Sequence, residues 1–243
     1  MAVAAKAFQH WRATVAPDES TTDLCRMTGI KRSTLAQQLV RNKVSMATVI
    51  RVARAYGQDP VTALSSFAEF AGLEEGRREP TQAELISQVA YPCILKALLD
   101  RSTAGEGGNI PEPQLCAYPY TGSVRQWFDA IDPGDLRLQL SAATGTAPQN
   151  ISAQLTAGRL APELAIAAAR LAGVSLTSGL VVTGVLQPEE GGWPPKGREK
   201  AIEELSDVEL VTLARDRLDA LSKALRKREQ DAKFDQALLE NLG

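Results

Sequence analysis

The chain has 243 residues, 44% of them hydrophobic and 23% charged, which allows one large domain or two small ones with packed cores. Its net charge of −2 means that any nucleic-acid surface must be a local patch of positive charge. Three distant cysteines and one histidine, His10, exclude a standard zinc site, and we predict no metal and no cofactor. No apolar run approaches the roughly 20 residues of a membrane span, and no signal peptide is recognised, so we expect a cytoplasmic protein with no membrane contact.

Alanine and leucine are abundant and β-branched residues do not alternate with polar ones, so we predict an all-α fold without strands. In the first 100 residues, helices are predicted at 2–15, 22–27, 32–41, 46–56, 61–70 and 81–99, the last with a bend at Pro92. Gly29 and Gly57 end two of these helices, and Asp59-Pro60 begins another. Cys25 falls on an apolar helix face and is interpreted as a core residue.

The helix at 32–41 carries most of the functional signal. Gly29 ends the helix before it, Leu35 and Leu39 share its apolar face, and Ser33 or Thr34 is expected to cap its start. The other face and the following turn carry side chains that hydrogen-bond to base edges and phosphates. These predicted DNA-binding residues are Lys31, Arg32, Ser33, Thr34, Gln37, Gln38, Arg41, Asn42 and Lys43. We interpret the segment as the recognition helix of a helix-turn-helix domain.

The pattern returns without a gap after a shift of 116 positions. Trp11 matches Trp127, and Leu64 matches Leu180, with Thr-Gly, Gln-Leu and Ala-Arg pairs repeated between them. We call residues 11–64 the first repeat and residues 127–180 the second repeat. The matches fall at core positions, so the sequence predicts two tandem helix-turn-helix modules of one design.

The two repeats differ in charge. Between Gly29 and Gly57 the first repeat has six lysines and arginines and no acid, which suits a phosphate backbone. The matching stretch from 145 to 173 has two arginines opposed by one glutamate, so little positive charge is available to hold DNA. Its candidate residues for a possible second DNA site are Gln149, Asn150, Gln154 and Arg159. Two alternatives stay open for this repeat, base contact or a role as a protein-interaction or spacing module.

The predicted domain organisation is an N-terminal module with an extra helix at 1–100, a linker at 101–118, a second module at 119–190, and a hinge with a C-terminal helix at 191–243. In the last segment, apolar side chains alternate steps of three and four over Val211, Ala214, Leu218, Leu221 and Leu225. This pattern is typical of a short dimerising coiled coil, and the cations that follow it, from 223 to 228, also allow a basic extra arm. The pattern equally fits a last helix that folds back on the second module, followed by a solvated tail.

The stretch from 28 to 57 resembles the lambda-repressor-like (XRE-type) helix-turn-helix family. The resemblance rests on Thr-Gly-Ile, Arg-Ser-Thr-Leu, Arg-Asn-Lys and Ala-Arg-Ala-Tyr-Gly, and it extends over about 5–72 and more weakly over 121–186. The Leu-Ser-Asp-Val-Glu-Leu segment at 205–210 also resembles immunity repressors of phages that infect actinobacteria. This resemblance implies a lysogeny repressor in which Arg32, Gln37 and their neighbours face the groove and Lys43 lies near phosphates.

The sequence therefore predicts a sequence-specific repressor that binds a double-stranded DNA operator. It acts either as a monomer that uses both modules or as a homodimer joined through the C-terminal helix. The alternative is a helix-turn-helix interaction protein, such as an antitoxin or antirepressor partner. We expect no enzyme, since no nucleophile with a base and no glycine-rich phosphate loop is present.

Overall fold

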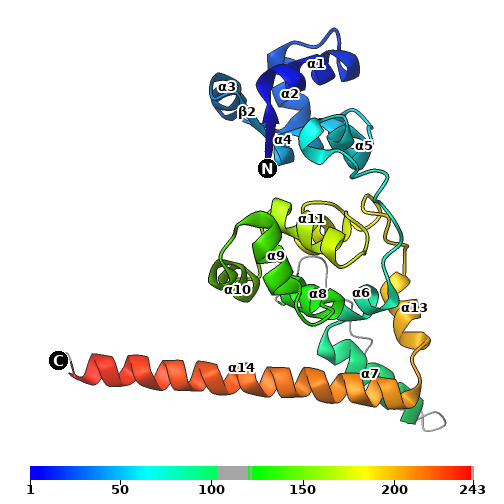
Figure 1. Cartoon of the computed structure of the whole chain (residues 1–243), viewed down its shortest axis with the longest axis vertical. Helices are drawn as coiled ribbons and strands as arrows, with labels where there is room; N and C mark the ends of the chain where they lie inside the picture. Colours follow the sequence, from blue (N-terminus) through cyan, green and yellow to red (C-terminus); the bar gives the residue numbers. More distant parts are fainter. Residues whose placement is uncertain (103–119, 121, 242–243) are drawn as a thin grey trace. The chain divides into compact units, whose positions relative to one another are not determined.

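The computed structural model describes the backbone of residues 1–102, 120 and 122–241, and the side chains as far as residue 233 (Figure 1). The predicted linker at 101–118 falls almost wholly outside these residues, as does Cys116. The described part is mostly helical, which confirms the predicted fold class at that level. It forms two compact units, unit 1 of Met1–Gln88 with Ala117–Gly197, and unit 2 of Val89–Cys116 with Arg198–Gly243. No helix in the described part is long and apolar enough to cross a bilayer.

The first part of unit 1 holds five α-helices, two short strands and a 3₁₀ helix. In chain order these are β1 (Ala2–Ala4), α1 (Ala5–Val15), α2 (Thr21–Thr28), α3 (Arg32–Val40), β2 (Lys43–Ser45), α4 (Met46–Ala55), α5 (Pro60–Ser65) and η1 (Ala68–Phe70). Most bounds lie within one or two residues of the predicted ones, because capping residues and glycines fix them. Three of these helices begin with a capping side chain that accepts a hydrogen bond from a backbone N–H, namely Ser20 for α2, Ser45 for α4 and Asp59 for α5.

The prediction of a strand-free fold is wrong for two three-residue segments. β1 and β2 pair antiparallel, with Val3 opposite Val44. Both valines are fully buried, so the pair ties the start of the chain to the turn after α3. Strands of this length contain too few residues for alternation to be recognised in the sequence.

The predicted single helix at 81–99 is two helices, α6 (Gln82–Ser87) in unit 1 and α7 (Tyr91–Ser102) in unit 2. Pro92 lies in the first turn of α7, where proline fits a helix because its missing N–H has no partner there. Thr81 and Glu84 form a capping box at the start of α6. Glu84 is fully buried and also accepts a 3.0 Å hydrogen bond from Trp127 Nε1, which binds α6 to the second repeat.

The second part of unit 1 repeats the first. Its helices are α8 (Ser123–Ile131), α9 (Leu136–Thr144), α10 (Pro148–Thr156), α11 (Pro162–Leu171) and α12 (Ser178–Val182). Helices α10 and α11 begin and end 116 residues after α3 and α4. The turns also correspond, because Gly29 and Gly145 are both left-handed and the threonine before each donates to the carbonyl four residues back.

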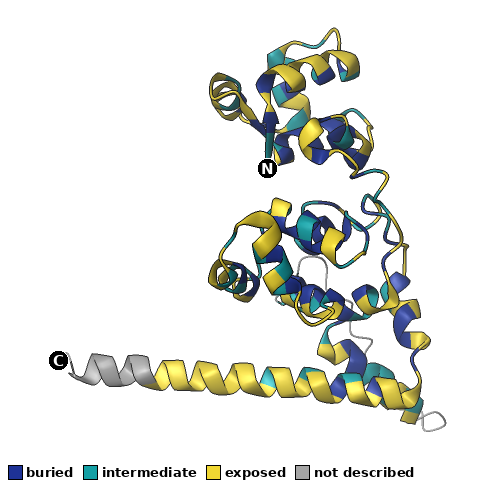
Figure 2. Ribbon diagram, in the orientation of Figure 1, coloured by how far each residue is buried: buried dark blue, intermediate teal, exposed yellow. Residues whose placement is uncertain are grey.

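One cluster of buried apolar side chains runs through both repeats of unit 1 (Figure 2). Trp11 packs against Phe8 and Phe67, with ring centroids 5.9 and 5.7 Å apart. Trp127, at the equivalent position, is fully buried. The matched apolar positions of the sequence repeat are therefore core positions in the fold.

Unit 2 contains α7, α13 (Gly197–Glu203) and α14 (Asp207–Asn241). The first residue of α13, Gly197, is still assigned to unit 1. Helix α14 packs on α7, with Leu210 and Ala214 buried, and most of its remaining described length is exposed (Figure 2). Arg101 satisfies carbonyl groups at and just after the C-terminal end of α13. It donates to the carbonyl oxygens of Leu205 and Ile202 at 2.6 and 2.9 Å. Of the predicted coiled-coil positions, Ala214 is buried and Leu218 is exposed.

Candidate nucleic-acid interface

The turn between α2 and α3 fixes where α3 begins. Gly29 has a φ of +66° and ends α2, and the Thr28 hydroxyl accepts a 3.4 Å hydrogen bond from the Ile30 N–H. Ile30 is buried, so the chain is fixed against the core immediately before α3 starts. A residue with a side chain is strained at that φ, which is why glycine occupies this turn.

Helix α3 lies with its apolar face on the core. Leu35 is 1% exposed, and Leu39 is half-buried and packs against the same cluster. On the opposite face, the side chains of Arg32, Thr34 and Gln37 are exposed, as is Ser33. The predicted front of the helix is therefore accessible in the described structure.

The predicted cap of α3 is wrong. The N-cap residue is Lys31, and no side chain bonds to the first N–H groups of the helix. Ser33 and Thr34 already lie inside the first turn of the helix, past the N-cap position, and both residues are exposed. Uncapped N–H groups at a helix start favour an anion, and a DNA phosphate is one.

Gln38 differs from the other predicted DNA-binding residues because its amide oxygen is used inside the protein. It accepts hydrogen bonds from the Ser45 N–H at 3.0 Å and the Thr48 hydroxyl at 2.9 Å. Thr48 is buried, and Ser45 caps α4, so Gln38 binds the end of α3 to the start of α4. Only its amide N–H₂ group is left to face a base.

The turn after α3 presents three further predicted residues. Arg41, Asn42 and Lys43 are all exposed. Asn42 is left-handed with a φ of +53°, a conformation that asparagine tolerates better than most residues. Lys43 lies on β2, where its side chain points to the opposite side from the buried Val44.

The charge of this surface is positive. Among the residues that the structure describes, no acidic side chain lies within ion-pair distance of Lys31, Arg32, Arg41, Lys43 or Arg51. The sixth cation of the stretch, Arg54, pairs with Glu190 at 2.6 Å. Four of these five cations lie on α3 or directly beside its ends, and Arg51 lies on α4. This segment therefore carries a local positive charge that the net charge of the chain does not suggest.

The second repeat presents a different surface at the equivalent place. Gln149 and Asn150 are exposed on α10, and Arg159 is exposed in the turn that follows. Gln154 is less available for DNA contact than these residues, because its amide oxygen accepts a 2.9 Å hydrogen bond from the Ala161 N–H. Gln154 is thus the structural equivalent of Gln38, 116 positions later. Glu163 nearby pairs with the amino terminus at 3.3 Å.

The repeated Gln-Leu pair is recognised in the sequence, but both glutamines are predicted there as DNA contacts, and the structural role that their recurrence signals is missed. Gln38 and Gln154 are identical in the two repeats, whereas Gln37 is replaced by Ala153. A residue kept in both copies while the surrounding surface changes has a structural role that both copies share. Arg54 is one of the six cations predicted to suit a phosphate backbone, but it pairs with Glu190, a residue outside both repeats.

Other candidate reactive groups are dispersed. His10 is exposed on α1, Cys25 is half-buried against the core as predicted, and Cys93 is buried in unit 2. Within residues 1–102 and 120–233, apart from 121, no group of three potential metal ligands comes together. Comparisons with family models, with curated proteins and with solved structures find no match to this chain.

Proposed function

We propose that the chain is a sequence-specific double-stranded DNA-binding protein that represses transcription. In this proposal α2 and α3 form a helix-turn-helix, and α9 and α10 form a second one. Helix α3 enters the major groove, and the cations at its two ends hold the phosphates on either side. The phage lysogeny repressor that the sequence resemblance implies is the biological setting we propose for it.

The observation that carries this proposal is the exposed cationic face of α3 and of its flanking turns. Arg32 and Gln37 have the side chains that read guanine and adenine edges, and both are exposed beside an uncapped helix start. The buried Leu35 fixes this face on the core, so that little backbone order has to be gained on binding.

In this proposal the second repeat contributes mainly to sequence specificity, through base contacts, and little to the affinity for DNA. Its exposed Gln149 and Asn150 can pair with adenine edges, but the stretch from 145 to 173 adds just two arginines, Arg159 and Arg170, opposed by Glu163. One chain then reads two unequal half-sites, and the first repeat supplies most of the phosphate contacts.

A selection of bound duplexes from a random pool tests the proposal directly. A long asymmetric motif is expected if both repeats read bases, a short motif if only the first does, and a palindrome if two copies bind together. Enrichment of no sequence would contradict sequence-specific binding.

Gln37→Ala is the sharpest single variant, because it gives the first repeat the alanine that the second has at this position. We expect it to relax discrimination at one base pair by about 1–3 kcal/mol and to leave binding to random DNA unchanged. An equal loss on selected and random DNA would show that Gln37 does not read a base.

An interaction protein is the second candidate, and one observation favours it for the second repeat. Leu138 on α9 is 66% exposed on a repeat whose neighbouring α10 surface is nearly neutral, a combination more typical of protein contacts. Binding to random duplex over a salt series separates the candidates. The repressor proposal expects a steep loss of affinity with salt, and a flat response would favour the interaction protein.

A further inference from the structure

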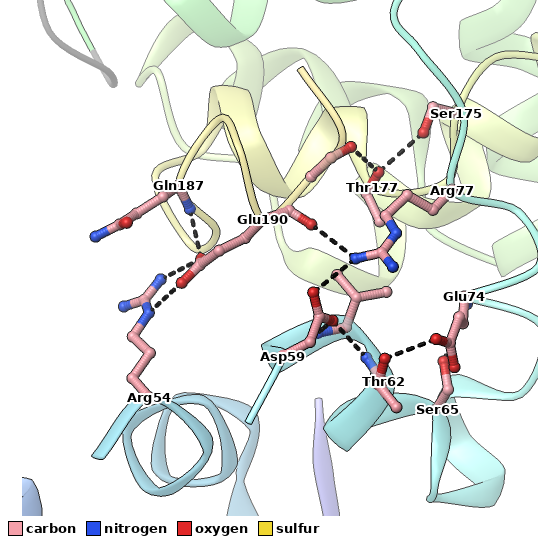
Figure 3. A network of polar contacts seen from close by, with 12 residues as sticks. Arg54, Asp59, Thr62, Ser65, Glu74, Arg77, Ser175, Thr177, Gln187 and Glu190 are labelled. Carbon is pink, nitrogen blue, oxygen red and sulfur yellow. Dashed lines mark hydrogen bonds and ion pairs between the residues drawn. The ribbon is translucent and has the colours of Figure 1, made fainter. Parts of the chain in front are cut away.

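Within unit 1, four charged side chains join the first repeat and the chain that leaves it to the loop that follows α12. We call Arg54, Asp59, Arg77 and Glu190 the junction cluster (Figure 3). Arg54 and Glu190 form a bidentate pair, with Nε–Oε1 and Nη2–Oε2 distances of 2.6 Å. A bidentate pair restricts direction as well as distance, which a single contact does not.

The second half of the cluster is arranged around Arg77. Its Nη1 donates to Asp59 Oδ2 at 2.8 Å and to the Glu190 carbonyl oxygen at 3.3 Å, so one guanidinium contacts both partners. Asp59 is itself held by the N–H groups of Val61 and Thr62, whose bonds it accepts as the cap of α5. Burial alone would raise the pKa of Asp59, but these N–H groups and Arg77 outweigh it and hold the pKa below its ordinary value.

Glu190 is in turn fixed to the second repeat. The loop that carries it is bound by the Thr177 hydroxyl, which donates to the Gly191 carbonyl oxygen at 2.7 Å. The Gln187 N–H donates to the Glu190 carboxylate at 2.7 Å. A Cβ on Gly191 would lie 2.2 Å from a methyl group of Val181, so this loop packs tightly on α12.

Backbone bonds reinforce the charged contacts. The Leu176 N–H donates to the Gly76 carbonyl oxygen at 3.0 Å, and the Arg78 N–H donates to Ser175 Oγ at 3.0 Å. The chain leaving the first repeat is therefore bonded to the loop before α12. Ion pairs near the surface are individually weak, but here the Arg54–Glu190 and Arg77–Asp59 pairs are linked by the bond from Arg77 to the Glu190 carbonyl oxygen. They therefore act together with the backbone bonds.

We infer that the junction cluster determines the spacing between the two DNA half-sites. By holding the repeats in one relative position, it requires a duplex to present its two half-sites at one separation. The four residues are positioning residues that need not touch DNA. This inference rests on the proposed function, in which both repeats contact bases.

The variant Asp59→Asn/Glu190→Gln tests this inference without removing a cation from the DNA-binding surface. Asparagine is as good a helix cap as aspartate, so α5 keeps its start while both ion pairs lose their charge. Asp23→Asn/Asp129→Asn is the matched control. It makes the same change in net charge, but its ion pairs, with Arg26 and Arg125, lie within single helices.

The first measurement needs no DNA. Spin labels at Ala13→Cys and Ala130→Cys, both exposed and outside the predicted DNA surface, report the distance between the repeats after the native cysteines are replaced. We expect one narrow distance distribution for the parent and the control, and a distribution at least twice as wide for the junction variant. An unchanged narrow distribution in the junction variant would overturn the role of the cluster.

The second measurement uses the duplex selected from the random pool, with one or two base pairs inserted between its half-sites. The parent and the control are expected to lose at least tenfold in affinity on insertion, and the junction variant less than threefold. Equal tolerance in parent and variant would overturn the spacing rule. Absence of all selective DNA binding would overturn the proposed function, while the label distances would still report whether the cluster holds the repeats together.

Discussion

The two repeats of unit 1 share a backbone and a core but not a surface. Their turn glycines, their threonine hydrogen bonds and the glutamine that joins two successive helices recur at the same spacing. Between Gly29 and Gly57, five cations have no ion-pair partner among the described residues, and the equivalent surface of the second repeat has little charge. This difference indicates that the fold constrains the buried and hydrogen-bonded positions, while the exposed positions are free to take up separate tasks.

The largest effect is expected where the repeats are most alike. Leu35 and Ile151 are equivalent and fully buried, so Leu35→Ala and Ile151→Ala should each cost about 2–5 kcal/mol of unfolding free energy. Because one apolar cluster runs through both repeats, urea unfolding followed by circular dichroism and by tryptophan fluorescence should show one shared transition. Separate transitions in either variant would show that the repeats unfold independently.

The glutamine shared by both repeats should separate structure from recognition. Gln38→Ala removes the acceptor of two hydrogen bonds and Gln154→Ala the acceptor of one, so we expect losses of about 2 and about 1 kcal/mol in unfolding free energy. Gln37→Ala, at an exposed neighbouring position, should change stability by less than about 0.5 kcal/mol. Urea denaturation measures all three, and a loss for Gln37→Ala as large as that for Gln38→Ala would contradict the assignment.

The charge difference between the repeats should be visible in the salt dependence of DNA binding. Lys43→Ala is expected to lower the slope of log affinity against log salt by about one, which is roughly eightfold in affinity at about 0.1 M salt. Asn150→Ala should leave the slope unchanged, because an amide displaces no counterion. Fluorescence anisotropy with a labelled duplex measures both. A change of slope for Asn150→Ala alone would reverse the roles of the repeats.

The smallest effect concerns a contact that only the first repeat has. The Tyr56 hydroxyl donates to Glu19 at 2.8 Å, whereas the equivalent position in the second repeat is Ala172. Burial and the hydrogen bond to Glu19 raise the pKa of Tyr56 to about 12, from an ordinary value of 10.0. The folded pKa lies above the unfolded one, so this contact stabilises fully below pH 10 and is lost as the pH rises toward 12.

Tyr56→Phe should therefore cost about 1 kcal/mol at pH 7. Absorbance titration at alkaline pH should show that the variant lacks a tyrosine that titrates near pH 12 in the parent. A variant that loses instead a tyrosine titrating near the ordinary value would contradict the contact.

Much of this fold follows from local signals. Gly29, Ser45 and Asp59-Pro60 mark helix ends by backbone conformation and capping, which depend on neighbouring residues alone. The exposed Arg32 and buried Leu35 follow from helical periodicity. The inward bonds of Gln38 could not be predicted in this way, because its partners are Ser45, at the end of β2, and Thr48, on α4. The pairing of Arg54 with Glu190, 136 residues away, depends on the folded arrangement and leaves no pattern in the sequence.

The bond between Trp127 and the buried Glu84 has a consequence for biosynthesis. Glu84 leaves the ribosome 43 residues ahead of its partner, which is roughly 2–9 s at ordinary rates of translation. During that interval the Glu84 carboxylate has no indole partner and is hydrated by water instead. The Glu84 carboxylate therefore loses its water late in the folding of the protein, after Trp127 has been synthesised and can donate its hydrogen bond.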